Sequence, residues 1–132
     1  MGVIAKAGTL PYRRLMSGEI EILAIARHGS DHWILPMGRI EPGEIAKDAA
    51  IRETQEEAGI NVHPQAFIGK LCFGEHEVEY FLSQYLGDVE WPEKDQRQRC
   101  WIPLSQAEEI IAPDFHIFVV TARKVLESVQ GK

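Results

Sequence analysis

Seven residues in the middle of the chain stand at fixed spacings and constrain its fold more than any other feature. They follow the pattern G-x5-E-x7-R-E-x2-E-E-x-G and are Gly38, Glu44, Arg52, Glu53, Glu56, Glu57 and Gly59. At average residue usage such a set arises by chance about once in 10⁸ placements, whereas a chain of this size offers on the order of 100 placements. The spacing therefore indicates one specific local structure.

The pattern predicts a loop, a helix and a sharp stop. Residues 41–44, Glu-Pro-Gly-Glu, form the predicted loop, and residues 45–58 form the predicted helix. Gly59 follows at the place where many helices end in a left-handed residue, a conformation that glycine adopts without strain.

Three carboxylates are expected on one face of this helix. Residues three and four apart are neighbours on a helix, so Glu53, Glu56 and Glu57 project together. Carboxylates in one patch repel one another unless a cation lies among them, and Mg²⁺ prefers carboxylate oxygens together with water and phosphate oxygens. A solvated acidic face is the ordinary alternative. The fixed glycines, Glu44 and Arg52 favour a Mg²⁺ site, with Mn²⁺ as the alternative ion.

The stretch from Gly38 to Ile60 resembles the Nudix box of the Nudix hydrolases. It departs from that box at Thr54, where an aliphatic residue is usual; a backbone carbonyl one turn earlier can accept a hydrogen bond from this hydroxyl. The resemblance implies an α/β Nudix fold, with a mixed β-sheet between α-helices, over residues 1–132 as a single domain. It also implies divalent-metal-dependent hydrolysis of a phosphoanhydride bond in a nucleoside diphosphate linked to another moiety.

The resemblance assigns roles within the box. It implies a metal held by the Gly38 carbonyl and by the carboxylates of Glu53, Glu56 and Glu57. Arg52 belongs to the catalytic set as the residue that orients a glutamate ligand. Glu53 or Glu57 is the candidate for the base that takes a proton from water, and an acid outside the box is the alternative. For Glu44, a structural role and an indirect contact to metal through water both stay open.

The rest of the chain mixes strands with helices, which predicts an α/β sandwich. Strands are predicted at residues 3–12, 19–26, 33–35, 66–73, 78–86 and 99–102. The second of them becomes continuously apolar and is expected to be buried on both faces. A short helix is predicted to start at Ser105, and an amphipathic helix to cover residues 115–129.

Charge and composition exclude some classes of partner. The net charge of −6 argues against non-specific nucleic-acid binding, which depends on neutralising phosphates. No apolar run approaches the roughly 18–20 residues of a membrane span, and the N-terminus has no signal-peptide pattern. Cys72 and Cys100 are isolated, which predicts two reduced core thiols and a cytoplasmic protein.

Segments outside the box point to a class of substrate. Residues 7–14, 33–36 and 91–101 are similar to the diphosphoinositol polyphosphate and diadenosine polyphosphate hydrolases. Met37 stands where that branch often has lysine or glycine, so a phosphate-binding cation is missing there. Its possible replacements are Arg13, Arg14, Arg27, His28, Arg39 and Lys70. Arg27 and His28 follow an apolar strand and Arg39 lies in the box loop, so these three are the predicted substrate contacts.

Two other functions stay open on the sequence. A MutT-like nucleoside triphosphate pyrophosphohydrolase shares the same box. A Nudix module that binds a nucleotide without cleaving it usually lacks box carboxylates, whereas Glu53, Glu56 and Glu57 are all present here. The intact box therefore favours an enzyme acting on a small-molecule nucleotide or polyphosphate.

Overall fold

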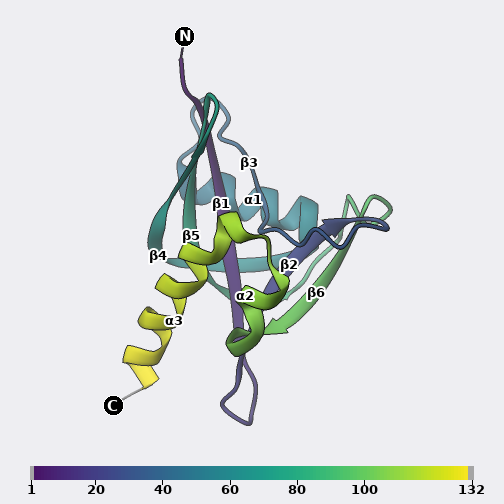
Figure 1. Cartoon of the computed structure of the whole chain (residues 1–132). Helices are drawn as coiled ribbons and strands as arrows, with labels where there is room; N and C mark the ends of the chain where they lie inside the picture. Colours follow the sequence, from purple (N-terminus) through teal and green to yellow (C-terminus); the bar gives the residue numbers. More distant parts are fainter. Residues whose placement is uncertain (1, 131–132) are drawn as a thin grey trace.

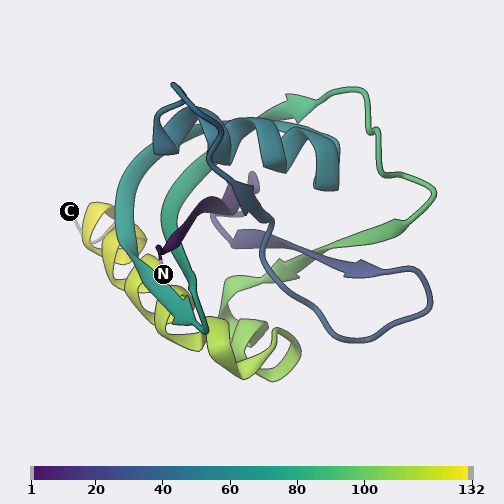
Figure 2. The same ribbon diagram turned by 90° about the horizontal axis from the view of Figure 1, so that it is seen from above.

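A mixed β-sheet lies between helices, as the sequence predicts. The computed structural model describes residues 2–130; residues 1, 131 and 132, which the expected single domain also includes, lie outside the described residues. One helix, α1, covers one face of the sheet, and α2 and α3 cover the other (Figures 1 and 2). None of the helices in residues 2–130 is both long and apolar enough to cross a membrane.

Six strands form the sheet in the order β4-β5-β1-β2-β6, and β3 pairs with β1 at its side. The strands are β1 Ile4–Arg14, β2 Ile20–Arg27, β3 Met37–Arg39, β4 Ile60–Phe73, β5 His76–Asp88 and β6 Arg97–Pro103. The main helices are α1 Ala46–Ala58, α2 Ala107–Ile110 and α3 His116–Gln130, with short 3₁₀ turns at Leu104–Gln106 and Pro113–Phe115. Among the six strands described in residues 2–130, the β1–β5 pairing is parallel and the others are antiparallel, so the sheet is mixed.

The two faces of β2 explain the position of the core. Ile22 and Ala24 pack in the main cluster with residues of α3, such as Phe118. Leu23 and Ile25 point the other way and pack with Ala58 of α1. The prediction that this strand is buried on both faces is therefore confirmed.

Small side chains let α1 approach the sheet closely. Ala49 and Ala50 are fully buried against Ala7 of β1. Thr54 is also fully buried, and its hydroxyl donates to the Ala50 carbonyl at 2.7 Å, as the sequence predicts. Since this bond uses the single hydroxyl proton of Thr54, the Thr9 hydroxyl must be the donor in the 2.7 Å contact between the two threonines.

Replacing Thr54 with valine is expected to destabilise the chain by about 1–3 kcal/mol, because the buried Thr9 hydroxyl loses its acceptor. Replacing both Thr9 and Thr54 with valine should recover most of that loss, because two apolar groups of the same shape need no hydrogen bond. Urea unfolding of the two single variants and the double variant measures the coupling. Strictly additive losses would contradict the assigned contact.

The prediction of a strand at residues 33–35 is wrong. Trp33 and Ile34 make only single bridges, to Ile111 and Ile25, so this segment changes partner within two residues and builds no ladder. The third strand, β3, instead starts after Pro36 and pairs with residues 6–8 of β1. This shift places Gly38 in β3, directly against the Glu53 side chain of α1.

Other boundaries differ in length. The predicted strands at 66–73 and 78–86 are parts of β4 and β5, which pair from Ile60 to Asp88 because register shifts absorb the irregular positions within the hairpin. The strand predicted at 99–102 extends over Arg97–Pro103. The short helix predicted at Ser105 begins as a 3₁₀ turn at Leu104 and continues as α2.

The cysteine prediction is wrong for one of the two thiols. Cys72 is exposed and lies next to the last residue of β4, in a stretch of exposed positions. Cys100 is partly buried and packs against the main core.

Candidate active site

Both ends of α1 are fixed by groups outside the helix. At the start, Glu41 donates its backbone N–H to the Glu44 carboxylate at 3.0 Å, which closes the loop. At the end, Gly59 adopts the left-handed conformation, with φ of 67°, as predicted. Trp91 donates to the Glu57 carbonyl at 2.8 Å and Arg99 donates to the Ala58 carbonyl at 2.6 Å. These side chains satisfy carbonyls that a helix end otherwise leaves without partners.

Arg52 organises the acidic face of α1. Its Nε and one Nη2 proton hold both oxygens of Glu44 at 2.9 Å, and its second Nη2 proton is donated to the Arg39 carbonyl at 2.8 Å. Nη1 donates to Glu53 at 2.8 Å and to Glu56 at 3.1 Å. A guanidinium has five N–H donors, and all five are used within the protein. Arg52 is therefore a positioning residue with no donor left for a substrate.

Glu44 has a structural role. Both of its oxygens accept hydrogen bonds from Arg52, and one also accepts the Glu41 N–H. The Arg52 guanidinium lowers the pKa of Glu44 to about 2. Of the two roles that the sequence leaves open for Glu44, this arrangement favours the structural one.

Glu57 is the most buried carboxylate of the box, with only 6% of its surface exposed. One oxygen accepts the backbone N–H of Met37 at 3.1 Å. Burial raises the pKa of Glu57 to about 8; Arg97 opposes that rise and the neighbouring Glu53 carboxylate adds to it. The ionised form of Glu57 thus needs more positive charge nearby than the protein supplies.

The groups where β3 meets the acidic face of α1 suit a hard divalent cation. Gly38 and Glu53 approach so closely that a Cβ at position 38 would overlap the Glu53 carboxyl group. The donors gathered here are carboxylate and backbone oxygens, which Mg²⁺ and Mn²⁺ prefer. Within residues 2–130, no three acidic, His or Cys side chains already surround one point, and Glu53 and Glu56 instead each give an oxygen to Arg52. The four-group metal site stays a prediction.

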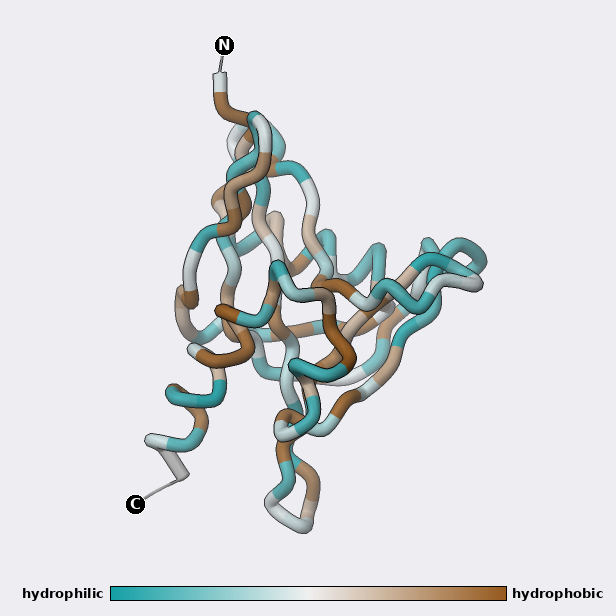
Figure 3. Tube along the Cα trace, in the orientation of Figure 1, coloured by the Kyte–Doolittle hydropathy of each residue, from teal (hydrophilic) through white to brown (hydrophobic). Residues whose placement is uncertain are grey.

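Two of the three predicted substrate contacts lie together. Arg27 and His28 line a cavity of about 350 Å³ with Gln96 and Arg97. It lies where β2 ends and β6 begins, and the loops there are strongly hydrophilic (Figure 3). Arg39 does not line this cavity; it lies in β3, and its carbonyl anchors Arg52.

The remaining candidate cations lie elsewhere. Arg13 pairs with Glu21 and stacks on Trp101 at 4.0 Å. Lys70 pairs with Glu77 at 3.0 Å. Arg14 is opposite Ile20, at the far end of β2 from Arg27. These three residues are not part of the cavity that contains Arg27 and His28.

The sequence prediction missed two residues beside the box. Arg97 lines the cavity and pairs with Glu93 at 2.7 Å. Glu93 in turn donates its backbone N–H to the Glu56 carbonyl at 3.1 Å. Arg97 could have been predicted only from the pairing of β2 with β6, which places it opposite Arg27. That pairing joins positions about 70 residues apart, and no local sequence pattern encodes it.

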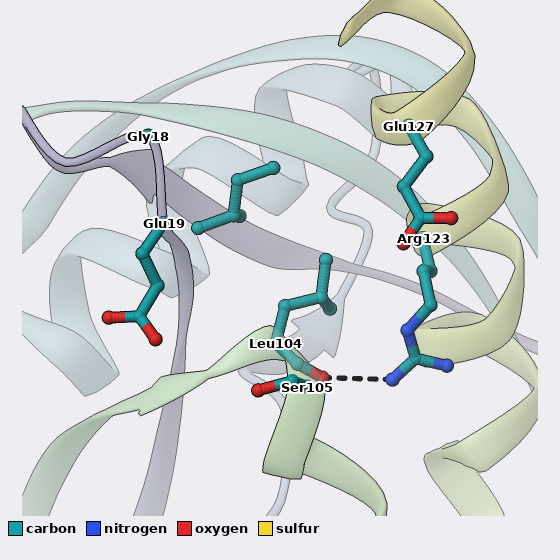
Figure 4. Close-up of a pocket in the computed structure, with 7 residues that line it drawn as sticks. Gly18, Glu19, Leu104, Ser105, Arg123 and Glu127 are labelled. Atoms are coloured by element: carbon teal, nitrogen blue, oxygen red, sulfur yellow. Dashed lines mark hydrogen bonds between the residues drawn. The ribbon is translucent and has the colours of Figure 1, made fainter. Parts of the chain in front are cut away.

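A second cavity, of about 180 Å³, lies beside α3, in the helical layer that does not contain α1 (Figure 4). It is bounded by the β1–β2 turn, the segment after β6, and α3. Arg123 reaches across its wall and donates to the Leu104 carbonyl at 2.8 Å. None of the predicted site residues lines this cavity.

Comparisons with known proteins all identify the same family. The NUDIX domain matches residues 13–121. Nudix hydrolase 21, chloroplastic, from Arabidopsis thaliana is 36% identical over 115 residues, which cover 78% of this chain and 57% of that protein. The asymmetrical bis(5'-nucleosyl)-tetraphosphatase of Caenorhabditis elegans is 48% identical over 59 residues, covering 44% of this chain and 42% of that protein. The chain thus spans about half the length of the curated relatives it matches.

Solved structures agree with this family over nearly the whole chain. A binary complex of a C. elegans Ap4A hydrolase is similar at a TM-score of 0.71 and 27% identity, covering 96% of this chain and 99% of that one. A MutT NUDIX hydrolase from Burkholderia pseudomallei has the same TM-score at 19% identity, covers 92% of this chain and 98% of that one, and shows the fold alone. The resemblance expected from residues 38–60 is confirmed.

Proposed function

Because the chain belongs to the Nudix family, we propose that it hydrolyses a phosphoanhydride bond in a nucleoside polyphosphate with the help of a divalent cation. The observation that carries this proposal is the set of carboxylates organised by Arg52 beside the buried Glu57. An acidic helix face that served only for solubility would not need a guanidinium with all five donors engaged.

The proposed metal ligands are those expected from the sequence: the Gly38 carbonyl and the carboxylates of Glu53, Glu56 and Glu57. When bound, Mg²⁺, or Mn²⁺ in its place, supplies charge neutralisation for phosphate oxygens and a more acidic water. The close approach of Gly38 to Glu53 supports this set, as does the burial of the Glu57 carboxyl group, whose ionised form a cation would stabilise.

The chain's own residues divide the remaining work. Arg52 holds Glu53 and Glu56 in fixed orientations. Glu57 or Glu53 is proposed to take the proton of the attacking water. Arg27, His28 and Arg39 are proposed to contact the phosphates, since guanidinium groups bind them with two parallel hydrogen bonds.

Diadenosine tetraphosphate is the substrate that the comparisons favour. Relatives from C. elegans and Sus scrofa are each named as a bis(5'-nucleosyl)-tetraphosphatase, and the similar C. elegans structure is named as an Ap4A hydrolase. A nucleoside triphosphate, as expected for a MutT-like pyrophosphohydrolase, is the alternative, and an inositol pyrophosphate is a third substrate to test. The cytoplasmic location expected from the sequence also stays a proposal, because one relative is named as chloroplastic.

We expect the chain to turn over diadenosine tetraphosphate in the presence of Mg²⁺. In EDTA, turnover should be lower by a factor of at least about 10³, because stabilisation of charge by the metal contributes several kcal/mol. Product release is followed by chromatography for diadenosine tetraphosphate, nucleoside triphosphates and inositol pyrophosphates. Turnover that EDTA leaves unchanged would reject the metal-dependent mechanism. Nucleotide binding without cleavage of any substrate would favour the non-catalytic module.

A further inference from the structure

Two arginines face each other directly across two strands. In the antiparallel pairing of β2 with β6, Arg27 is opposite Arg97. Like charges at opposite positions destabilise a sheet. The backbone here is nevertheless well fixed: His28 donates to the Gln96 carbonyl at 3.0 Å, and the Gln98 amide donates to the carbonyls of Arg27 at 3.2 Å and Ser30 at 2.6 Å.

The two guanidinium groups are not equally compensated. Arg97 pairs with Glu93 at 2.7 Å. For Arg27, no ion pair occurs among residues 2–130. Two arginines against the single carboxylate of Glu93 leave this wall with excess positive charge in a chain whose net charge is −6, and His28 lines the same cavity.

This cavity lies on the same side of the sheet as the box. Side chains two residues apart in a strand share a face, and Ile25, two residues before Arg27, packs with Ala58 of α1. Glu93, the partner of Arg97, is bonded through its backbone to the Glu56 carbonyl at 3.1 Å. The paired arginines therefore lie beside the last turn of α1, next to the proposed reacting centre.

We propose that Arg27 and Arg97 together bind a phosphoryl group of the substrate that is not being cleaved. The inference rests on the proposed function and specifies the chemistry of one part of that site. The four residues lining the cavity are two arginines, a histidine and a glutamine, and none of them is Phe, Tyr or Trp. Two guanidinium groups and an imidazole match a chain of phosphates. The anion offsets the repulsion between Arg27 and Arg97, and it selects substrates with a long polyphosphate.

The binding test uses inorganic tripolyphosphate and the full chain in EDTA, so that it does not depend on turnover. We expect Arg27→Gln to weaken tripolyphosphate binding, measured by calorimetry, about tenfold or more. Lys124→Gln is the control, because Lys124 is an exposed cation on α3, in the layer of the molecule that does not contain α1. Equal affinities in these two variants would overturn the inference.

Glu93 and Arg97 give a second test in which the expected effects have opposite signs. Arg97→Gln removes a proposed ligand and should weaken tripolyphosphate binding, whereas Glu93→Gln frees Arg97 and should strengthen it. A purely structural Glu93–Arg97 ion pair predicts the same direction of change in both variants. That result would overturn the role of Arg97 even if either variant lost some stability.

Kinetics separates this inference from the proposed function. If diadenosine tetraphosphate is cleaved, Arg27→Gln should raise KM about tenfold and leave kcat within about twofold, since the contact is made equally in the ground and transition states. A fall in kcat with unchanged KM would contradict the assignment. If the parent chain cleaves nothing but binds tripolyphosphate through Arg27, the anion site stands and the hydrolase proposal fails.

Discussion

Replacing Glu57 with glutamine is expected to lower kcat about 10²–10⁴-fold while the chain stays folded. Glutamine has nearly the same shape and keeps an oxygen to accept the Met37 N–H, so the local packing persists. It cannot take a proton from water and it carries no charge for a cation. Steady-state hydrolysis of diadenosine tetraphosphate with saturating Mg²⁺ measures the effect.

The same substitution has an opposite effect on stability without metal. In EDTA, the folded-state pKa of Glu57 is about 8, above its ordinary value of 4.5. For an acid shifted upward, ionisation destabilises the fold: the loss begins above pH 4.5 and is complete above pH 8. The parent chain should therefore lose stability between pH 5 and pH 8. Glu57→Gln should lose less over that range, as measured by urea unfolding.

Glu109→Gln is the matched control, since Glu109 is exposed on α2 in the other layer. We expect its turnover and its pH dependence of unfolding to equal those of the parent chain. If Glu57→Gln and Glu109→Gln had the same kcat, Glu57 would be excluded as both metal ligand and base. A Glu57→Gln variant as pH-sensitive as its parent would show that another group titrates in this range.

Some features of the fold could be predicted because the information is local in the chain. The limits of α1 follow from the loop before it and from Gly59 after it, and the structure agrees within one residue. The hydrogen bond from Thr54 to Ala50 spans one turn of the same helix. The bonds from Arg52 to Glu53 and Glu56 likewise join near neighbours in sequence. Helical geometry brings residues four apart together, as in the Thr54–Ala50 and Arg52–Glu56 contacts, whereas the Arg52–Glu53 contact joins adjacent residues and depends on how the guanidinium is held.

Other features depend on how distant segments meet. Residues 33–35 have the composition of a strand, but β2 and the chain after α2 each take one of their bridges. Arg97 faces Arg27 only because β6 pairs with β2 in one particular register. Trp91 and Arg99 cap α1 from more than 30 residues away. A sequence pattern gives the propensity of each segment, and tertiary pairing decides its partners.

Replacing Arg52 with lysine is expected to lower kcat about 100-fold and to destabilise the chain by about 2–3 kcal/mol. Lysine keeps the charge but has three donors on one atom, whereas Arg52 uses five donors on three nitrogens. It cannot hold both oxygens of Glu44 and also reach Glu53 and Glu56. The carboxylates should then lose their fixed orientation although their number is unchanged.

Arg123→Lys provides the matched comparison in the opposite layer. Arg123 also makes a two-pronged ion pair, with Glu108 at 2.8 and 2.6 Å, and donates to the Leu104 carbonyl. Its replacement should reduce stability in the same way but leave kcat within about twofold. Because both variants lose packing and hydrogen bonds of the same kind, a difference in kcat between them isolates the orientation of the box carboxylates.

The dependence on Mg²⁺ distinguishes positioning from simple loss of stability. If Arg52 acts by aiming Glu53 and Glu56, Arg52→Lys should raise the Mg²⁺ concentration for half-maximal activity about 10–100-fold, as found when residues that orient metal ligands are removed. Arg123→Lys should not change that concentration, because its ion pair has no contact with the box. If Arg52→Lys lowered kcat at an unchanged Mg²⁺ requirement, the arginine would act on the reaction by a route other than the metal ligands. The proposal that Arg52 orients Glu53 and Glu56 for the metal would then be wrong.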